Sequence, residues 1–254
     1  MAQVLTLVYG VVAYALFLVA FLYAIGFVGN IVVPKSIDSG TTFPLTETLV
    51  TNVLLLTLFA VQHSVMARPA FKRWWTRIVP KQAERSTYVL LASSILLLLF
   101  WQWRPIPGVV WDVRSTMLGA LLLGLFGVGW LIVLLSTFMI NHFDLFGLRQ
   151  VTLYFQRRPY TPVSFVTRGL YKIVRHPIML GFLIGFWATP VMTLGHLMFA
   201  VITTAYIFVA LQLEEHDLLE ADRATYERYR RETSMLIPLP KGQRKAAAPV
   251  HERV

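Results

Sequence analysis

The chain is dominated by long apolar runs that contain almost no charged residue. They cover residues 4–33, 45–66, 88–103, 117–140 and 178–213. A helix that crosses the hydrocarbon core of a bilayer needs roughly 20 mostly apolar residues. Only 14% of the chain is charged, against about 25% in soluble proteins. No soluble fold of this length can hide so much apolar surface. The sequence therefore predicts an all-α integral membrane protein.

The last apolar run is too long for a single span. It contains 36 residues, and Pro190 and Gly195 lie near its middle. Proline interrupts the hydrogen-bond ladder of a helix, and glycine favours a turn. We expect a hairpin of two shorter helices, which gives six spans in total, or five if the hairpin only dips into the bilayer. The first run is about twice as long as the apolar core of a signal peptide and lacks a preceding basic stretch, so we expect it to be retained.

The basic residues are distributed asymmetrically. Of 23 lysines and arginines, 20 lie in residues 67–87, in residues 142–177 or after residue 213. Six spans place these three segments on one side, which the positive-inside rule assigns to the cytoplasm together with both termini. The net charge of +10 is thereby explained by topology, not by nucleic-acid binding. We expect a multi-pass inner-membrane protein with membrane helices in residues 1–140, an interfacial segment, hairpin and cytoplasmic C-terminal helix in residues 141–240, and a disordered tail in residues 241–254.

Three polar clusters lie at the predicted cytoplasmic interface. The first ends in Arg175-His176-Pro177. Pro177 lies where a helix would begin, and at this position the missing N–H of proline breaks no helical hydrogen bond. The second is Glu214-Glu215, and helical spacing from Leu211 predicts that Glu214 faces the protein. The third runs from residue 141 to residue 150. Each cluster alone is also compatible with an ordinary membrane interface. The chain has no cysteine, which excludes a thiol nucleophile and a thiolate metal site.

In this order, the motifs resemble those of the isoprenylcysteine carboxyl methyltransferase superfamily of membrane methyltransferases. The resemblance covers residues 156–238, about a third of the chain. Its motifs are Thr167-x-Gly169-x-Tyr171, Arg175-His176-Pro177, the break at Pro190, Glu214-Glu215-x-x-Leu218, Tyr226-x-x-Tyr229 and Ile237-Pro238. The segment from Ser136 to Val151 is similar to one in methanethiol S-methyltransferases, bacterial membrane enzymes that make dimethyl sulfide.

The resemblance implies that S-adenosylmethionine binds at the cytoplasmic interface, without a Rossmann domain and without a metal. His176 and the free N–H groups at the start of the following helix suit the methionine carboxylate. Glu214 suits the ammonium or the ribose, and Tyr171 and Phe165 offer aromatic surface. The implied contact residues are Gln156, Val163, Ser164, Phe165, Val166, Tyr171, His176, Pro177, Ile178, Met179 and Glu214.

The catalytic groups are predicted from chemistry and not from the resemblance. A small volatile thiol attacks as a thiolate, and a thiol has a pKa of about 8.5 or above, so a base or a cation is needed. His142 is the first candidate for the base, with Asp144 orienting it, and Arg175 is a candidate for the cation.

One departure bears on the substrate. Relatives that act on prenylcysteine carry an arginine four positions before the residue that matches Glu214, and here that position is Ala210. The loss disfavours a carboxylate substrate. The alternatives are a methyltransferase for a lipid or prenylcysteine substrate, and a non-enzymatic transport or assembly protein with the same fold.

Overall fold

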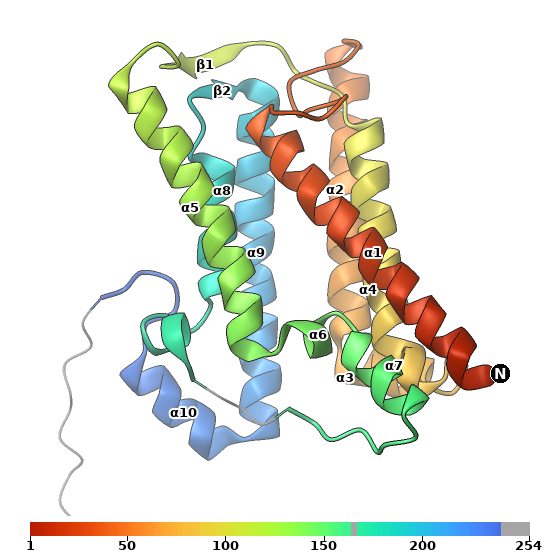
Figure 1. Ribbon diagram of the computed structural model, residues 1–254. Coiled ribbons are helices and arrows are strands. Elements are labelled where there is room, and N and C mark those ends of the chain that lie inside the picture. The colour runs from red at the N-terminus through yellow and green to blue at the C-terminus, as the bar shows by residue number, and fades with distance from the viewer. Residues whose placement is uncertain (164–166, 240–254) are drawn as a thin grey trace, which may run out of the picture.

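The computed structural model describes residues 1–163 and 167–239, which form a helical bundle (Figure 1). Five helices are long and apolar enough to cross a membrane. Less than half of each apolar window is buried inside the protein. The remaining apolar surface faces outward, where only lipid satisfies it. These helices are α1 (Ala2–Gly29), α2 (Leu45–Ala67), α4 (Lys81–Gln102), α5 (Met117–Ile140) and α9 (Leu194–Ala221).

The shorter elements gather at the two ends of the bundle (Figure 1). At the end that carries the N-terminus lie α3 (Pro69–Trp75), α6 (His142–Leu145), α7 (Leu148–Phe155), the 3₁₀ helix η1 (Gly169–Lys172) and α10 (Arg223–Glu232). At the opposite end, β1 (Val109–Asp112) pairs antiparallel with β2 (Val191–Thr193), with an irregularity between Val109 and Trp111. The basic segments found in the sequence therefore share one end of the bundle.

The predicted break in the last apolar run is confirmed, but its two arms are unequal. The first arm, α8 (Pro177–Trp187), has only 11 residues. At 1.5 Å per residue it is about 16 Å long, half of a hydrocarbon core of about 30 Å. The second arm is α9, with 28 residues, because the helix continues past Glu214 into the segment where a separate C-terminal helix was expected. No glycine or proline interrupts α9 after Glu214, and the helix ends only at Ala221. Asp222 follows and caps α10 by accepting from Thr225 N at 3.1 Å.

Two other predicted boundaries shift. The third membrane helix begins at Lys81 and not at residue 88, because the polar turns that follow Pro80 continue directly into the apolar run. The first helix ends at Gly29, where Asn30 adopts a left-handed conformation (φ 54°) and its N–H bonds to Gly26.

Helices α5 and α8 approach each other closely because glycines face each other. A Cβ atom on Gly129 would lie 2.8 Å from the Gly181 carbonyl oxygen and 2.8 Å from the Gly185 nitrogen. A Cβ atom on Gly181 would lie 2.6 Å from the Gly129 oxygen. Small residues allow this backbone contact between membrane helices. The contact holds the short α8 along the longer α5.

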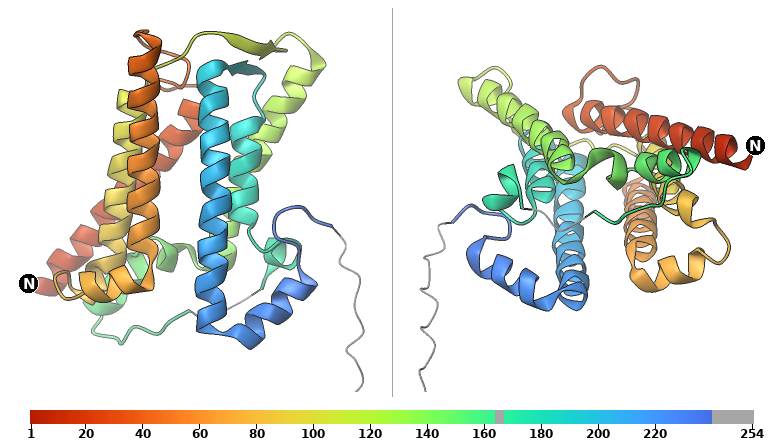
Figure 2. Two further views of the ribbon diagram at one scale, coloured as in Figure 1. Left: turned by 180° about the vertical axis from the view of Figure 1, so that it is seen from behind. Right: turned by 60° about the horizontal axis from the view of Figure 1, so that its bottom comes forward.

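An aromatic cluster closes the bundle near the β strands. Phe27 of α1 meets Trp103 edge to face at 6.0 Å, and Trp103 meets Phe199 of α9 at 5.7 Å. All three side chains are buried. Seen from behind, α2 and α9 run as two long helices with α3 and α10 at the same end (Figure 2). Ser64 and Tyr206 join α2 to α9 through a hydroxyl pair at 3.1 Å.

The glycine contact can be tested with a matched pair of substitutions. Gly129→Ala places a methyl group against backbone atoms that cannot move aside, and overpacking of this kind costs about 1–3 kcal/mol. Gly127 has nothing within 4 Å of its added Cβ. We expect Gly129→Ala to lower the thermal unfolding midpoint in detergent and Gly127→Ala to leave it unchanged or slightly raised. Equal midpoints for the two variants would contradict the close approach.

Candidate functional site

The start of α8 presents unpaired backbone donors. His176 precedes the helix, and Pro177 occupies its first position with φ already helical. Leu180 N bonds to His176 O at 3.0 Å. Within residues 1–163 and 167–239, the N–H groups of Ile178 and Met179 have no acceptor. A helix N-terminus with free N–H groups favours an anion such as a carboxylate.

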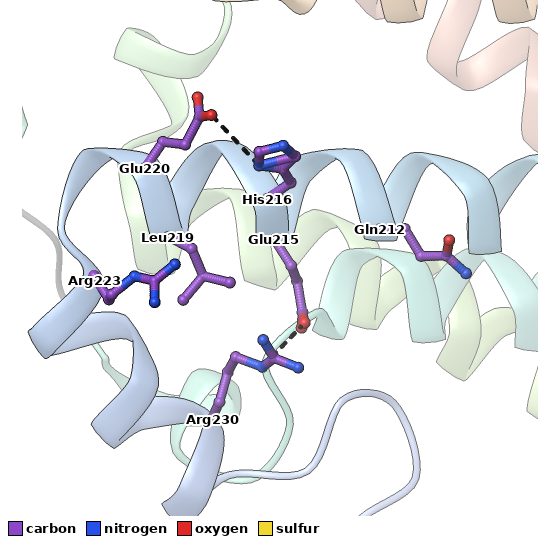
Figure 3. A pocket seen from close by; sticks show the side chains of 7 residues that line it. All are labelled: Gln212, Glu215, His216, Leu219, Glu220, Arg223 and Arg230. Atoms are coloured by element: carbon purple, nitrogen blue, oxygen red, sulfur yellow. Dashed lines mark ion pairs between the residues drawn. The ribbon is translucent and has the colours of Figure 1, made fainter.

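A buried carboxylate holds the segment that leads into α8. Glu215 Oε1 accepts from Arg175 Nε at 2.8 Å and lies 2.7 Å from Arg175 Nη2. The same oxygen lies 3.1 Å from His176 Nε2. Glu215 Oε2 lies 3.4 Å from Arg230 Nε of α10, and Figure 3 shows these two side chains directed toward each other across a pocket of about 560 Å³. One carboxylate thus joins α9, α10 and the start of α8.

The acid that faces the protein interior is Glu215, so the prediction that Glu214 does so was wrong. Ile207, Leu211 and Glu215 are buried and recur every four residues of α9, whereas the Glu214 side chain is 48% exposed. Each residue of a helix turns the side-chain direction by about 100°, so neighbours point to different faces. Glu214 still lies beside His176, with Oε2 3.6 Å from Nδ1.

The C-terminal segment is held against the start of α8. Arg175 Nη1 donates to Thr233 O at 2.5 Å, and Arg175 N donates to Ser234 O at 2.8 Å. His176 N donates to Met235 O at 3.2 Å. The Arg175 side chain is buried and its nitrogens are used in these bonds. The geometry therefore gives Arg175 a structural role and argues against its predicted use as a free cation beside a thiolate.

Tyr171 lies next to this arrangement. Gly169 starts η1 with φ 52°, and a Cβ atom there would lie 2.7 Å from Met139 Sδ of α5. Tyr171 O accepts a bond from Tyr229 Oη at 2.6 Å. Burial raises the pKa of the Tyr171 phenol, and the neighbouring charge of Glu214 raises it further. Tyr171, His176 and Glu214, predicted from separate motifs, are therefore brought together.

His142 lies just after α5, and aromatic side chains surround its ring. Thr137 Oγ1 uses its proton toward Leu134 O (2.7 Å), so it accepts from His142 Nδ1 at 2.8 Å. The remaining nitrogen, Nε2, then accepts from Tyr14 Oη of α1 at 2.8 Å. Phe138 stacks on the ring at 4.2 Å. Burial lowers the pKa of His142, so the ring is neutral at neutral pH and its Nε2 carries no proton.

The predicted orienting role of Asp144 was wrong. Asp144 Oδ1 bonds to Arg149 Nη1 at 2.8 Å, and Oδ2 accepts from Tyr160 at 3.3 Å. In the described part of the chain Asp144 makes no bond to His142. The ring is oriented by Thr137 and Tyr14, which sequence reasoning missed. Thr137 lies within the motif that starts at Ser136. A threonine near the end of a helix is common, however, and does not by itself indicate a functional role. Tyr14 lies 128 residues away in an apolar run and carries no signal.

The remaining predicted cofactor contacts are only partly described. Gln156 is exposed and ends α7, and Val163 is half-buried on the extended segment that follows (Figure 1). Ser164, Phe165 and Val166 lie outside the described residues, as does the predicted disordered tail. No group of three or more His, Asp or Glu side chains within the described ranges could hold a metal ion.

Comparison with known proteins identifies the family. The sequence model of the NnrU protein family matches residues 52–235. Methanethiol S-methyltransferase from Mycobacterium tuberculosis is 60% identical over 94% of this chain and 98% of its own length. Methanethiol S-methyltransferase 2 from Bradyrhizobium diazoefficiens is 60% identical over 93% of this chain and 91% of its own length. The methanethiol S-methyltransferase from Crocosphaera subtropica is 52% identical over 94% and 93% of the two chains.

No solved structure matches this chain. The relatives confirm the resemblance that the Ser136–Val151 segment suggested. Because the family model covers more than half of the chain and the relatives align over nearly all of it, the protein belongs to the NnrU family, together with the proteins named methanethiol S-methyltransferase.

Proposed function

We propose that this protein is an S-adenosylmethionine-dependent membrane methyltransferase that converts methanethiol to dimethyl sulfide. The observation that supports the proposal most is the alignment with proteins named for this reaction, at 60% identity over nearly both full lengths. A small neutral substrate also agrees with Ala210, since the arginine that prenylcysteine methyltransferases use at this position is absent.

The residues at the start of α8 fit the amino-acid part of S-adenosylmethionine. The N–H groups of Ile178 and Met179 can receive its carboxylate, and Glu214 can receive its ammonium. His176 remains a predicted contact, and its two ring nitrogens face Glu214 and Glu215. Tyr171 borders the same space. S-adenosylmethionine supplies an electrophilic methyl group when it is bound. Gln156 and residues 163–166 remain predicted contacts on the segment that follows α7.

The proposed base is His142. Its Nδ1 proton is held by Thr137, which leaves Nε2 as the basic atom. Tyr14 donates to Nε2 in the resting state, so a thiol proton reaches this nitrogen either when Tyr14 moves aside or through its hydroxyl. The aromatic rings around His142 exclude water, which keeps the ring neutral and ready to accept a proton. Methyl transfer then depends on alignment of the two sulfur atoms.

The activity is tested with purified protein, labelled S-adenosylmethionine and a panel of acceptors. We expect dimethyl sulfide in the headspace with methanethiol, and little label transfer to prenylcysteine or phosphatidylethanolamine. A protein that binds the cofactor but labels phosphatidylethanolamine in place of methanethiol would assign it to the lipid-methylating alternative. A folded protein that transfers no label to any acceptor would favour the non-enzymatic alternative.

Substitutions of the two adjacent acids should have different effects on stability and on S-adenosylmethionine affinity. Glu215→Ala leaves Arg175 buried without its carboxylate, which costs about 3–5 kcal/mol and should sharply lower the unfolding midpoint. Glu214→Ala removes a half-exposed group, so the midpoint should hardly change. S-adenosylmethionine affinity, measured by calorimetry in detergent, should fall roughly ten- to a hundredfold for Glu214→Ala, since a hydrogen bond to a charged group contributes about 1.5–3 kcal/mol. Unchanged affinity in folded Glu214→Ala would remove Glu214 from the site.

The role of His142 predicts a pH profile. Because burial lowers its pKa below the ordinary value of about 6.5, its basic form persists to pH values below 6.5, and only there should the parent rate fall. His142→Ala should lower the rate about 10²- to 10⁴-fold near neutrality. Its rate should then rise with pH as the thiolate forms unaided. His216→Ala, an exposed histidine of α9, is the control. Parallel profiles for His142→Ala and the parent would exclude His142 as the base.

The orientation in the membrane is part of the proposal. The basic end of the bundle, with the candidate site, is assigned to the cytoplasm by the positive-inside rule. The same rule assigns both termini to the cytoplasm. Reporter fusions at Asp38, Ala83, Asp112, Arg158 and the C-terminus should read outside, inside, outside, inside and inside. A periplasmic signal at Ala83 or Arg158 would reverse or break this topology.

A further inference from the structure

A second pocket lies at the same end of the bundle, on the side of α3 and α4. Its volume is about 550 Å³. It is lined by Lys72 of α3, the start of α4, the end of α5, α6, α7, and residues 158–160. It shares no lining residue with the start of α8. Its charged lining consists of Lys72, Lys81, Arg85, Arg158, Glu84 and Asp144.

The pocket carries an excess of positive charge. Asp144 is already paired with Arg149 at 2.8 Å, so it does not offset the lining cations. Glu84 is then the only remaining carboxylate among the lining residues, which include four basic side chains. Within the described part of the chain, Lys72, Lys81 and Arg158 make no ion pair within 4 Å. A concave site lined by one sign of charge attracts the opposite charge.

Partial burial of the Lys72 ammonium is unfavourable when no anion is bound beside it. The Lys72 side chain is partly buried, and burial, with the nearby charges of Arg85 and Arg68, lowers its pKa. The charges of Glu84 and Asp217 offset part of this lowering. Arg85 is positioned by a bond from Nε to Leu145 O at 2.6 Å and lies over the Tyr88 ring at 4.8 Å. A partly desolvated cation without a paired carboxylate is destabilising, and a bound anion would relieve this.

The neighbouring helix places the pocket at the bilayer surface. Phe71 and Trp75 of α3 pack against the buried cluster of Met66 and Tyr88, while Trp74 remains 50% exposed. Tryptophan at this position is typical of the interface, where an aromatic ring sits among lipid headgroups. Lys72 lies on the same short helix. The pocket is therefore at the depth of lipid phosphates, and basic pockets between membrane helices on this side bind anionic headgroups.

We propose that this pocket binds the phosphate-bearing headgroup of an anionic membrane lipid. Arg158 and Arg85 offer planar donor groups that match a phosphodiester, and Lys72 and Lys81 add charge. The pocket also includes Asn141, which precedes His142, and Asp144, which lies two residues after it. A bound headgroup therefore stabilises the turn that carries His142. The proposal does not depend on the identity of the methyl acceptor.

The test uses the purified full-length protein in a neutral detergent at about 0.15 M salt, where charges more than about 8 Å apart are screened. A fluorescent short-chain phosphatidylglycerol should bind saturably, and the corresponding phosphatidylcholine should not. Because each cation near a lipid surface contributes about 1 kcal/mol, Lys81→Gln should weaken binding about fivefold. Lys72→Gln/Arg158→Gln should weaken it about twenty-fivefold. Lys81 is exposed, so its replacement should not affect folding.

The matched control is Arg73→Gln/Arg77→Gln. These two arginines are exposed in and just after α3 and do not line the pocket, so their loss should change affinity less than twofold. Equal losses in the control and the pocket variants would overturn the site. Displacement of the lipid by inorganic phosphate at equal concentration would overturn the lipid assignment. Loss of S-adenosylmethionine binding in folded Lys81→Gln would show that the pocket belongs to the cofactor.

Discussion

The buried ion pair between Glu215 and Arg175 is the interaction on which the candidate site depends. The carboxylate of Glu215 holds Arg175 and His176 before α8 and reaches Arg230 of α10. The backbone N–H groups of Arg175 and His176 donate to the carbonyls of Ser234 and Met235. Three separate parts of the chain are thus joined at one point. Removing one partner of a buried pair costs far more than the pair itself contributes, so this geometry is strongly maintained.

A second constraint sets the depth of the site. Helix α8 has only 11 residues. Gly181 of its second turn packs against Gly129 and Val133 of α5, so its free N–H groups lie beside α5 and not at the end of a full span. Irregular backbone at membrane depth is tolerated only where protein or a cavity satisfies it. The glycine contact of α8 with α5 through Gly129 and Gly181 and the C-terminal segment at its start provide these surroundings. The short helix and the buried ion pair therefore act together.

A local sequence pattern predicted the structure correctly where it has one physical outcome, and it did not where the interacting residues come from distant segments. Pro190 broke the last apolar run as expected, because proline cannot continue the helix ladder. The sequence did not show which of Glu214 and Glu215 is buried, because a shift of one residue turns the side-chain direction by about 100°. Helix α9 also continues further than expected. The expected partner of His142 was its sequence neighbour Asp144. Its real partners are Thr137, on the preceding turn, and Tyr14 of α1, 128 residues away.

The sequence by itself determined the class of protein, its membrane helices, the end at which its basic residues gather and the motifs by which it resembles membrane methyltransferases. These follow from transfer free energies and backbone chemistry, which act on a residue through its immediate neighbours. Only the tertiary structure decided which acid is buried, that Arg175 is structural, and that His142 is held between Thr137 and Tyr14. It also decided that four cations from α3, α4 and the segment after α7 share one pocket. These outcomes depend on which helix faces approach one another, and that is set by packing over the whole bundle.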